Sequence, residues 1–535
     1  MSFLKNMFAD KPQQLLNEGL KAYRDNKYGE GIKLLNEAIS LSPKLTEAFH
    51  CRGLCFQQMN RFEDALADLN QVLQIDPEFN STVYYSRGLT YKNIGTAEKA
   101  IADFNKFISL NPKHANARYH RADLLYAAEK YDEALDDIVH LQNLSPDHFE
   151  GMILCASIRI AKGDFKRAIL DLNTAISLKP SHAEGWVLRG EAKFQLGQFN
   201  EAFNDLSKAI DIEPGNSKAL LKLGKVYFAK GNTEEALEQT GISLKISPSY
   251  LEAHRFRAEV LIKIEDYEGT LLTLNRILEL DPEDHASRLR RGQLKKILKD
   301  ILGAKNDFYK NLAEFPNDPD AYFSLGQLET ADGNFVQAIE LFTKALALAP
   351  ENPLFYNERG LANYSFKKYA DSLSDFSKAI ELSEDYTYYY NRALAKMELW
   401  DNNGAMSDLT MALNKPDFVN AYFARGELKI KQGDFNAALL DYDRIIQIDV
   451  NNKNAYYKKS ICYRTLGNAD YGLREINRSI KIDSAFPDAY FQRALIYLML
   501  SSFKNAKTDV ITALKLGLEE SKAQAEQLLT SLAKY

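Results

Sequence analysis

The sequence predicts an all-α protein, a solenoid of tandem antiparallel helix pairs. Ten prolines follow one another at intervals of 34 residues, with a single interval of 35. A proline inside a helix removes a backbone hydrogen bond and clashes with the preceding turn, so this spacing marks the junctions between helices. The ten prolines are Pro43, Pro77, Pro112, Pro146, Pro180, Pro214, Pro248, Pro282, Pro316 and Pro350.

Small side chains recur in the same 34-residue frame. Position 8 is Gly, Ala or Ser in all fifteen repeats, and position 20 is mostly Ala. Two helices approach closely only where neither carries a bulky side chain, so these positions predict a crossing inside each repeat. Position 24 is larger and usually apolar, as at Leu69 and Phe104. We expect it to fill the space beside the crossing.

The period of 34 with small, aromatic and proline landmarks resembles the tetratricopeptide repeat (TPR) family. The resemblance implies a right-handed α-solenoid superhelix, with fifteen repeats over residues 12–516. We expect residues 1–11 to be an N-terminal lead-in. A solenoid must cover its last apolar face, so we expect residues 517–535 to form a C-terminal capping helix. Repeats 11 to 14 depart from the pattern and place Glu384, Asp417, Val450 and Ser484 where proline is expected.

Composition and charge disfavour several classes of protein. The 67 Lys and Arg residues against 73 Asp and Glu residues give a net charge of −6, which disfavours binding along a nucleic-acid backbone. No apolar run reaches the roughly 18–20 residues that a membrane span needs. The four cysteines are too few for a disulfide framework, and the N-terminus carries no secretory signal pattern. We therefore expect a cytoplasmic protein with no membrane insertion.

We find no pattern for catalysis or for metal binding. The sequence contains no His-Glu-x-x-His motif, nucleophile elbow or phosphate-binding loop. Cys51 and Cys55 lie one helical turn apart, but the second pair of ligands that zinc sites usually show is missing, so a core role is expected. We expect a protein that is not an enzyme and that has no cofactor and no metal site.

Arginine and aspartate vary together between the two helices of a repeat. Position 7 is Arg in ten repeats, and position 23 is Asp in nine of those ten. Repeats 1, 7 and 10 lose both charges together. One interpretation is an arginine ladder for acidic partners, and the other is an ion pair that joins helices. Joint loss favours the ion pair, because removing one partner leaves an uncompensated charge.

The resemblance implies that positions 2, 5, 9 and 12 of the first helix face a ligand groove. Position 5 is aromatic in four consecutive repeats, 12 to 15. An apolar groove rimmed by charge is typical of a protein-binding surface. The alternative is that a tightly wound superhelix buries these rings against neighbouring helices. The candidate groove residues are Tyr390, Leu394, Phe423, Glu427, Tyr457, Ile461, Phe491 and Leu495.

Repeat 9 carries a second candidate site, a basic face that could recruit an acidic segment or a phosphate. The alternative is a solvated helix face. Its residues are Arg288, Arg290, Arg291, Lys295, Lys296 and Lys299.

We predict a protein–protein interaction scaffold or adaptor that binds segments of other proteins, or peptides, in its concave groove. No repeat combines Lys at position 5 with Asn at position 9, so the two-carboxylate clamp for heat-shock-chaperone tails is not expected. Two alternatives stay open. One is a non-catalytic regulatory subunit of an enzyme or assembly complex, and the other is a sensor for a small ligand or nucleic acid.

Overall fold

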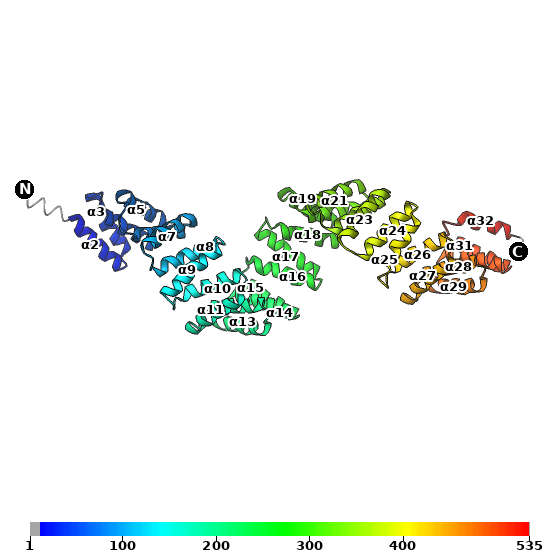
Figure 1. Cartoon of the computed structure of the whole chain (residues 1–535), viewed down its shortest axis with the longest axis horizontal. Helices are drawn as coiled ribbons and strands as arrows, with labels where there is room; N and C mark the ends of the chain where they lie inside the picture. Colours follow the sequence, from blue (N-terminus) through cyan, green and yellow to red (C-terminus); the bar gives the residue numbers. More distant parts are fainter. Residues whose placement is uncertain (1–10, 534–535) are drawn as a thin grey trace, which may run out of the picture. The chain divides into compact units, whose positions relative to one another are not determined.

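The computed structural model describes residues 11–533, and over that range every element of secondary structure is a helix. Figure 1 shows the helices in chain order, coloured from the N-terminus to the C-terminus. The predicted all-α solenoid of tandem helix pairs is confirmed. The predicted lead-in, residues 1–11, lies outside the described residues except for Lys11, where the first helix begins.

The chain divides into two compact units, and the boundary between Arg276 and Ile277 falls inside α17. The helices as far as this boundary are α2 (Lys11–Arg24), α3 (Tyr28–Leu41), α4 (Thr46–Gln58), α5 (Phe62–Ile75), α6 (Thr82–Ile94), α7 (Ala97–Leu110), α8 (Ala115–Ala127), α9 (Tyr131–Leu144), α10 (Phe149–Ala161), α11 (Phe165–Leu178), α12 (Ala183–Gln195), α13 (Phe199–Ile212), α14 (Ser217–Ala229), α15 (Thr233–Ile246), α16 (Leu251–Lys263) and α17 (Tyr267–Leu280).

The C-terminal unit continues the same series. Its further helices are α18 (His285–Ile297), α19 (Ile301–Glu314), α20 (Pro319–Ala331), α21 (Phe335–Leu348), α22 (Pro353–Ser365), α23 (Tyr369–Leu382), α24 (Tyr386–Glu398), α25 (Asn402–Ala412), α26 (Val419–Lys431), α27 (Phe435–Ile448), α28 (Lys453–Thr465), α29 (Ala469–Ile482), α30 (Pro487–Met499), α31 (Phe503–Lys515) and α32 (Lys522–Ser531).

Within each repeat an even-numbered helix comes first and an odd-numbered helix follows, and the two pack together in the pairs from α2–α3 to α14–α15 and from α18–α19 to α30–α31. The connection has about three residues, which forces the two helices to run antiparallel. The turn contains a residue in the left-handed region, as at Asn60 (φ 56°), Gly95 (φ 86°) and Trp400 (φ 64°). Inside each unit the second helix of one repeat then packs against the first helix of the next, from α3–α4 to α15–α16 and from α19–α20 to α29–α30, so these apolar faces are covered by a neighbour.

The crossing between the two helices of a repeat fits small residues against large ones. A methyl group placed on Gly360 would lie only 2.6 Å from a ring carbon of Phe376, and Gly326 stands in the same relation to Phe342. All five repeats with an aromatic ring at position 24 have Gly at position 8, whereas Ala at position 8 faces only Ile, Leu or Val. The predicted close crossing is therefore present, and its small and large residues are matched in size.

We expect Gly360→Ala to lower the free energy of unfolding by about 1–3 kcal/mol, because the added methyl group overlaps the Phe376 ring. The double variant Gly360→Ala/Phe376→Leu reproduces the Ala393–Leu409 combination of the next repeat and should recover much of this loss. Chemical denaturation of the four proteins of the double-mutant cycle measures the coupling.

Gly241→Ala is the matched control. This glycine lies in α15 with open space around it, so the change should be neutral or stabilising by up to about 1 kcal/mol. If Gly360→Ala had the same effect in the wild-type chain and in the Phe376→Leu variant, the size-matching explanation would be contradicted.

The predicted Arg–Asp ion pairs are present. Arg493 donates from Nε and a terminal nitrogen to both carboxylate oxygens of Asp509, at 2.7 and 2.8 Å, and a second terminal nitrogen donates to Asn477 Oδ1 at 2.7 Å. The arginine therefore joins the two helices of its own repeat and also reaches the second helix of the preceding repeat. The same fork occurs at Arg52, Arg87, Arg121, Arg189, Arg291, Arg359, Arg392 and Arg425.

We expect Arg493→Leu to destabilise the chain by about 2–4 kcal/mol, because it leaves the buried Asp509 carboxylate without its cation. Arg493→Leu/Asp509→Leu should be much closer to wild type, since repeat 10 already carries buried Leu325 and Leu341 at the same two positions. The midpoint of urea unfolding, followed by circular dichroism, measures both variants.

Arg444→Leu serves as control for removing an arginine, because Arg444 is exposed and its side chain bonds only to Gln447 among residues 11–533. An unchanged midpoint in Arg493→Leu would show that the pair has no structural role.

Helix α32 covers the end of the last repeat. Ala525, Leu518 and Leu532 are buried against α30 and α31, with at most 3% of each residue exposed. The division of residues 12–516 and 517–535 into separate domains stays a prediction.

All four cysteines are buried and unbridged, so the expected core role of Cys51 and Cys55 is confirmed. No helix within residues 11–533 has the length and apolar character of a membrane span.

Candidate functional site

The first helices of consecutive repeats meet along one face of the C-terminal unit. Two side-chain contacts join them there: Lys458 Nζ to Glu427 at 2.7 Å, and Arg464 Nε to Gln492 Oε1 at 3.2 Å. We call the side chains at positions 5, 9 and 12 of α24, α26, α28 and α30 the inner face. Its residues are Tyr390, Leu394, Met397, Phe423, Glu427, Ile430, Tyr457, Ile461, Arg464, Phe491, Leu495 and Leu498.

Aromatic rings of the inner face pack against other rings of the chain. The ring centroids of Tyr390 and Phe418 lie 5.1 Å apart, and those of Tyr457 and Phe486 lie 5.2 Å apart. Both phenylalanines immediately precede the next first helix, so the rings fill the gaps between repeats. Burial, together with nearby carboxylates, raises the pKa of Tyr457 to about 12. Tyr390, Phe423 and Tyr457 are partly buried, and Phe491 is buried, with 7% of its surface exposed.

The residues one helical turn further along add apolar surface to the inner face. Leu394, Ile461 and Leu495 are partly exposed, and together they offer apolar contact area beside the ring edges. Glu427 occupies the equivalent place in α26, and its ion pair with Lys458 adds charge between the apolar side chains. The inner face can thus contact an apolar segment without rearranging its rings. Its role as a binding site stays a prediction.

Sequence reasoning gave Arg464 no role. It lies at position 12, where the neighbouring repeats have Met397, Ile430 and Leu498. Gln492, which accepts the hydrogen bond from Arg464, is 4% exposed. The sequence feature that could have identified Arg464 is its charge at a position where the neighbouring repeats have apolar residues.

The six residues of the predicted basic face do not share one surface. Arg288 is buried and bonds to Glu314 and to the carbonyl of Pro282. Arg291 and Lys295 both bind Asp307, at 2.6 and 2.9 Å.

The other three basic residues are placed differently. Lys296 is half-buried and donates to Gln327 at 2.7 Å. Arg290 and Lys299 are exposed, so they are the part of this predicted site that solvent reaches. A role for them in binding stays a prediction.

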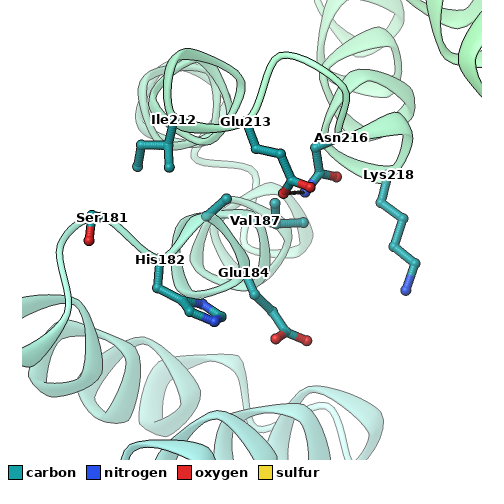
Figure 2. Close-up of a pocket in the computed structure, with 9 residues that line it drawn as sticks. Ser181, His182, Glu184, Val187, Ile212, Glu213, Asn216 and Lys218 are labelled. Carbon is teal, nitrogen blue, oxygen red and sulfur yellow. Dashed lines mark hydrogen bonds between the residues drawn. The ribbon is translucent and has the colours of Figure 1, made fainter.

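The N-terminal unit contains a hollow of about 470 Å³ beside the first turns of α12 and α14. Figure 2 shows Val187 and Ile212 among its lining residues, with His182 and Glu184 on one side and Glu213, Asn216 and Lys218 on the other. Asn216 Nδ2 donates to Glu213 at 2.8 Å.

The hollow lies where other repeats place an aromatic ring. Tyr85 and Tyr119, at position 5 of repeats 3 and 4, pack against His114 and His148 at ring distances of 4.9 and 5.3 Å. Repeat 6 has Val187 at position 5, so the corresponding space is left open. Sequence reasoning did not identify this hollow, although the missing ring was visible in the internal alignment.

Family models match several segments of the chain. Models described as tetratricopeptide repeat match residues 46–79, 81–114, 304–353, 323–387 and 419–452, and a model described as TPR repeat matches residues 190–231. Sperm-associated antigen 1 of Mus musculus is 35% identical over 66 residues, and that of Rattus norvegicus is 33% identical over 64 residues. Each match covers 12% of this chain and 7% of the relative's length.

Solved structures with similar helix arrangements have low overall scores. Naa15/Naa10 bound to HypK-THB has a TM-score of 0.38 and 13% identity, covering 98% of this chain and 96% of that chain. The Cut9-Hcn1 hetero-tetramer has a TM-score of 0.37 and 16% identity, covering 91% and 96%. Yeast Tom70 has a TM-score of 0.34 and 20% identity, covering 79% and 96%.

The family assignment therefore rests on the matched repeat segments, the 34-residue frame and the helix pairs that follow it. The chain belongs to the tetratricopeptide repeat family.

Proposed function

We propose that this protein is a non-catalytic interaction scaffold that holds segments of partner proteins on the inner face of α24 to α30. Proteins with this fold generally mediate protein–protein interactions. The observation that carries the proposal is the set of partly exposed apolar side chains at the same position of α24, α28 and α30, namely Leu394, Ile461 and Leu495, with Glu427 at that position of α26. Leu394 and Leu495 pack against buried core residues, so a partner segment meets a preformed surface.

The geometry favours an extended or helical segment over a flat protein surface. The apolar anchors lie on α24, α28 and α30, and the Glu427–Lys458 ion pair interrupts them at α26. A partner segment that places apolar side chains against these anchors would exclude water there. The charged pair would then determine the register in which that segment lies.

We expect the triple variant Leu394→Lys/Ile461→Lys/Leu495→Lys to lose partner binding at least tenfold, because it places three charges on the apolar strip. The measurement is affinity capture from the protein's own cells with quantitative mass spectrometry, followed by direct titration of the captured partner. Circular dichroism and the unfolding midpoint establish that the variant folds, which is expected because lysine can extend its charged end into water.

Leu302→Lys/Leu440→Lys/Val450→Lys is the matched control. These three apolar residues of the same unit are 65–83% exposed and lie outside the inner face. Partners that persist on the folded inner-face variant and disappear on the control would refute the inner face as the binding site.

A further inference from the structure

Arg464 differs from every other arginine that is at least partly buried within residues 11–533. Twelve such arginines place a guanidinium nitrogen within 3.2 Å of an Asp or Glu carboxylate. Arg464 is partly buried too, but over the same range the only hydrogen-bond partner of its guanidinium is the amide oxygen of Gln492. A partly buried cation without an anion is costly, and proteins rarely retain one without a use.

The neighbouring amide adds a second unsatisfied donor. Gln492 is 4% exposed, and its Oε1 accepts from Arg464 Nε at 3.2 Å. That hydrogen bond fixes the orientation of the amide, and it leaves the buried Nε2 with no partner among the described residues. Buried polar groups are nearly always hydrogen-bonded, so an unpaired donor calls for an explanation. Because Oε1 and Nε2 belong to one amide, the free donor lies beside the guanidinium.

We propose that Arg464 and Gln492 form a binding site for a single carboxylate of a partner segment lying on the inner face. A carboxylate has two acceptor oxygens, and a guanidinium edge with an adjacent amide N–H can bond both. Ile461 and Leu495 flank the two residues on the same helices and are partly exposed. The preferred segment therefore carries an acidic group between apolar side chains.

Charges already present near this site do not neutralise Arg464. Asp488 and Glu520 both act on Tyr457, which is also within electrostatic range of Arg464. Neither carboxylate forms an ion pair with Arg464 within the described part of the chain. Burial lowers the pKa of Arg464, in contrast to Arg493, whose pKa is raised by its hydrogen bonds to Asp509. The guanidinium keeps its charge in either case, because its ordinary pKa is above 12.

The inference rests on the proposed function, since it assigns the chemistry of a segment bound to that same face. The test uses the full chain and fluorescein-labelled peptides of the form Ser-Leu-X-Leu-Ser-amide, with X as Glu or Gln. A third peptide, Ser-Leu-Gln-Leu with a free C-terminus, separates a chain-terminal carboxylate from a side-chain carboxylate. Fluorescence anisotropy measures the dissociation constants.

We expect wild type to bind a carboxylate-bearing peptide about tenfold more tightly than the Gln amide peptide, the effect of one charge-assisted hydrogen-bond pair. Arg464→Met should abolish this preference, Gln492→Leu should reduce it, and Arg444→Met should leave it unchanged. Equal binding of all peptides would refute the carboxylate site while leaving the inner face intact as a binding surface. No binding of any acidic peptide to wild type would also refute the carboxylate site, whereas the proposed function is judged separately on the captured partner.

A stability measurement distinguishes the site from a structural role of Arg464. Removing an unpaired, partly buried charge should leave the unfolding midpoint of Arg464→Met unchanged or raised. A lowered midpoint, matched by a similar loss in Asp488→Asn or Glu520→Gln, would show that the chain supplies its own counter-ion and would overturn the proposal.

Discussion

The close crossing of two helices inside each repeat is the constraint on which the rest of the structure depends. It requires a small residue at position 8, and the size of that residue is matched to the side chain at position 24, as at Gly360 with Phe376. Only when the pair is this close can its remaining apolar surface be covered by the next pair. The same contact is repeated along both units, so stability accumulates through neighbours and not through one central core.

The Arg–Asp forks fix the register of the packed helices. Apolar contacts between helices tolerate small sliding movements, whereas a guanidinium that bonds both oxygens of an aspartate allows one register. Arg493 also reaches Asn477 of the preceding repeat, so the same side chain aligns neighbouring repeats. Repeat 10 has neither charge and packs Leu325 and Leu341 at positions 7 and 23. This agrees with the rule that apolar residues can replace both members of a buried ion pair, whereas replacing one member leaves an uncompensated buried charge.

Much of the fold could be predicted from the sequence because its signals repeat. The proline spacing, the small residues and the joint variation of positions 7 and 23 each appear many times, so chance departures do not hide them. Single residues were harder to place. Arg288 belongs to a run of basic residues, yet it is buried, because Glu314 and the Pro282 carbonyl happen to meet it. The packing of Tyr390 on Phe418 likewise depends on the turn before α26, which the 34-residue frame does not describe.

The inner face illustrates why a repeated scaffold can become specific at one place. Every repeat must bury its crossing, and nine repeats within residues 11–533 also bury an Arg–Asp fork, so these positions have little freedom to vary. Positions 9 and 12 of the first helices take no part in the crossing or in the Arg–Asp forks. Their side chains differ in chemistry between repeats, from Leu394 to Glu427 to Arg464. A change at these positions costs the helix pair little, because these side chains are already partly exposed to water. A residue that departs from the repeat pattern and has no counter-ion is therefore a good guide to what such a chain binds, and within the described part of the C-terminal unit Arg464, bonded only to the amide of Gln492 through its guanidinium, meets that criterion.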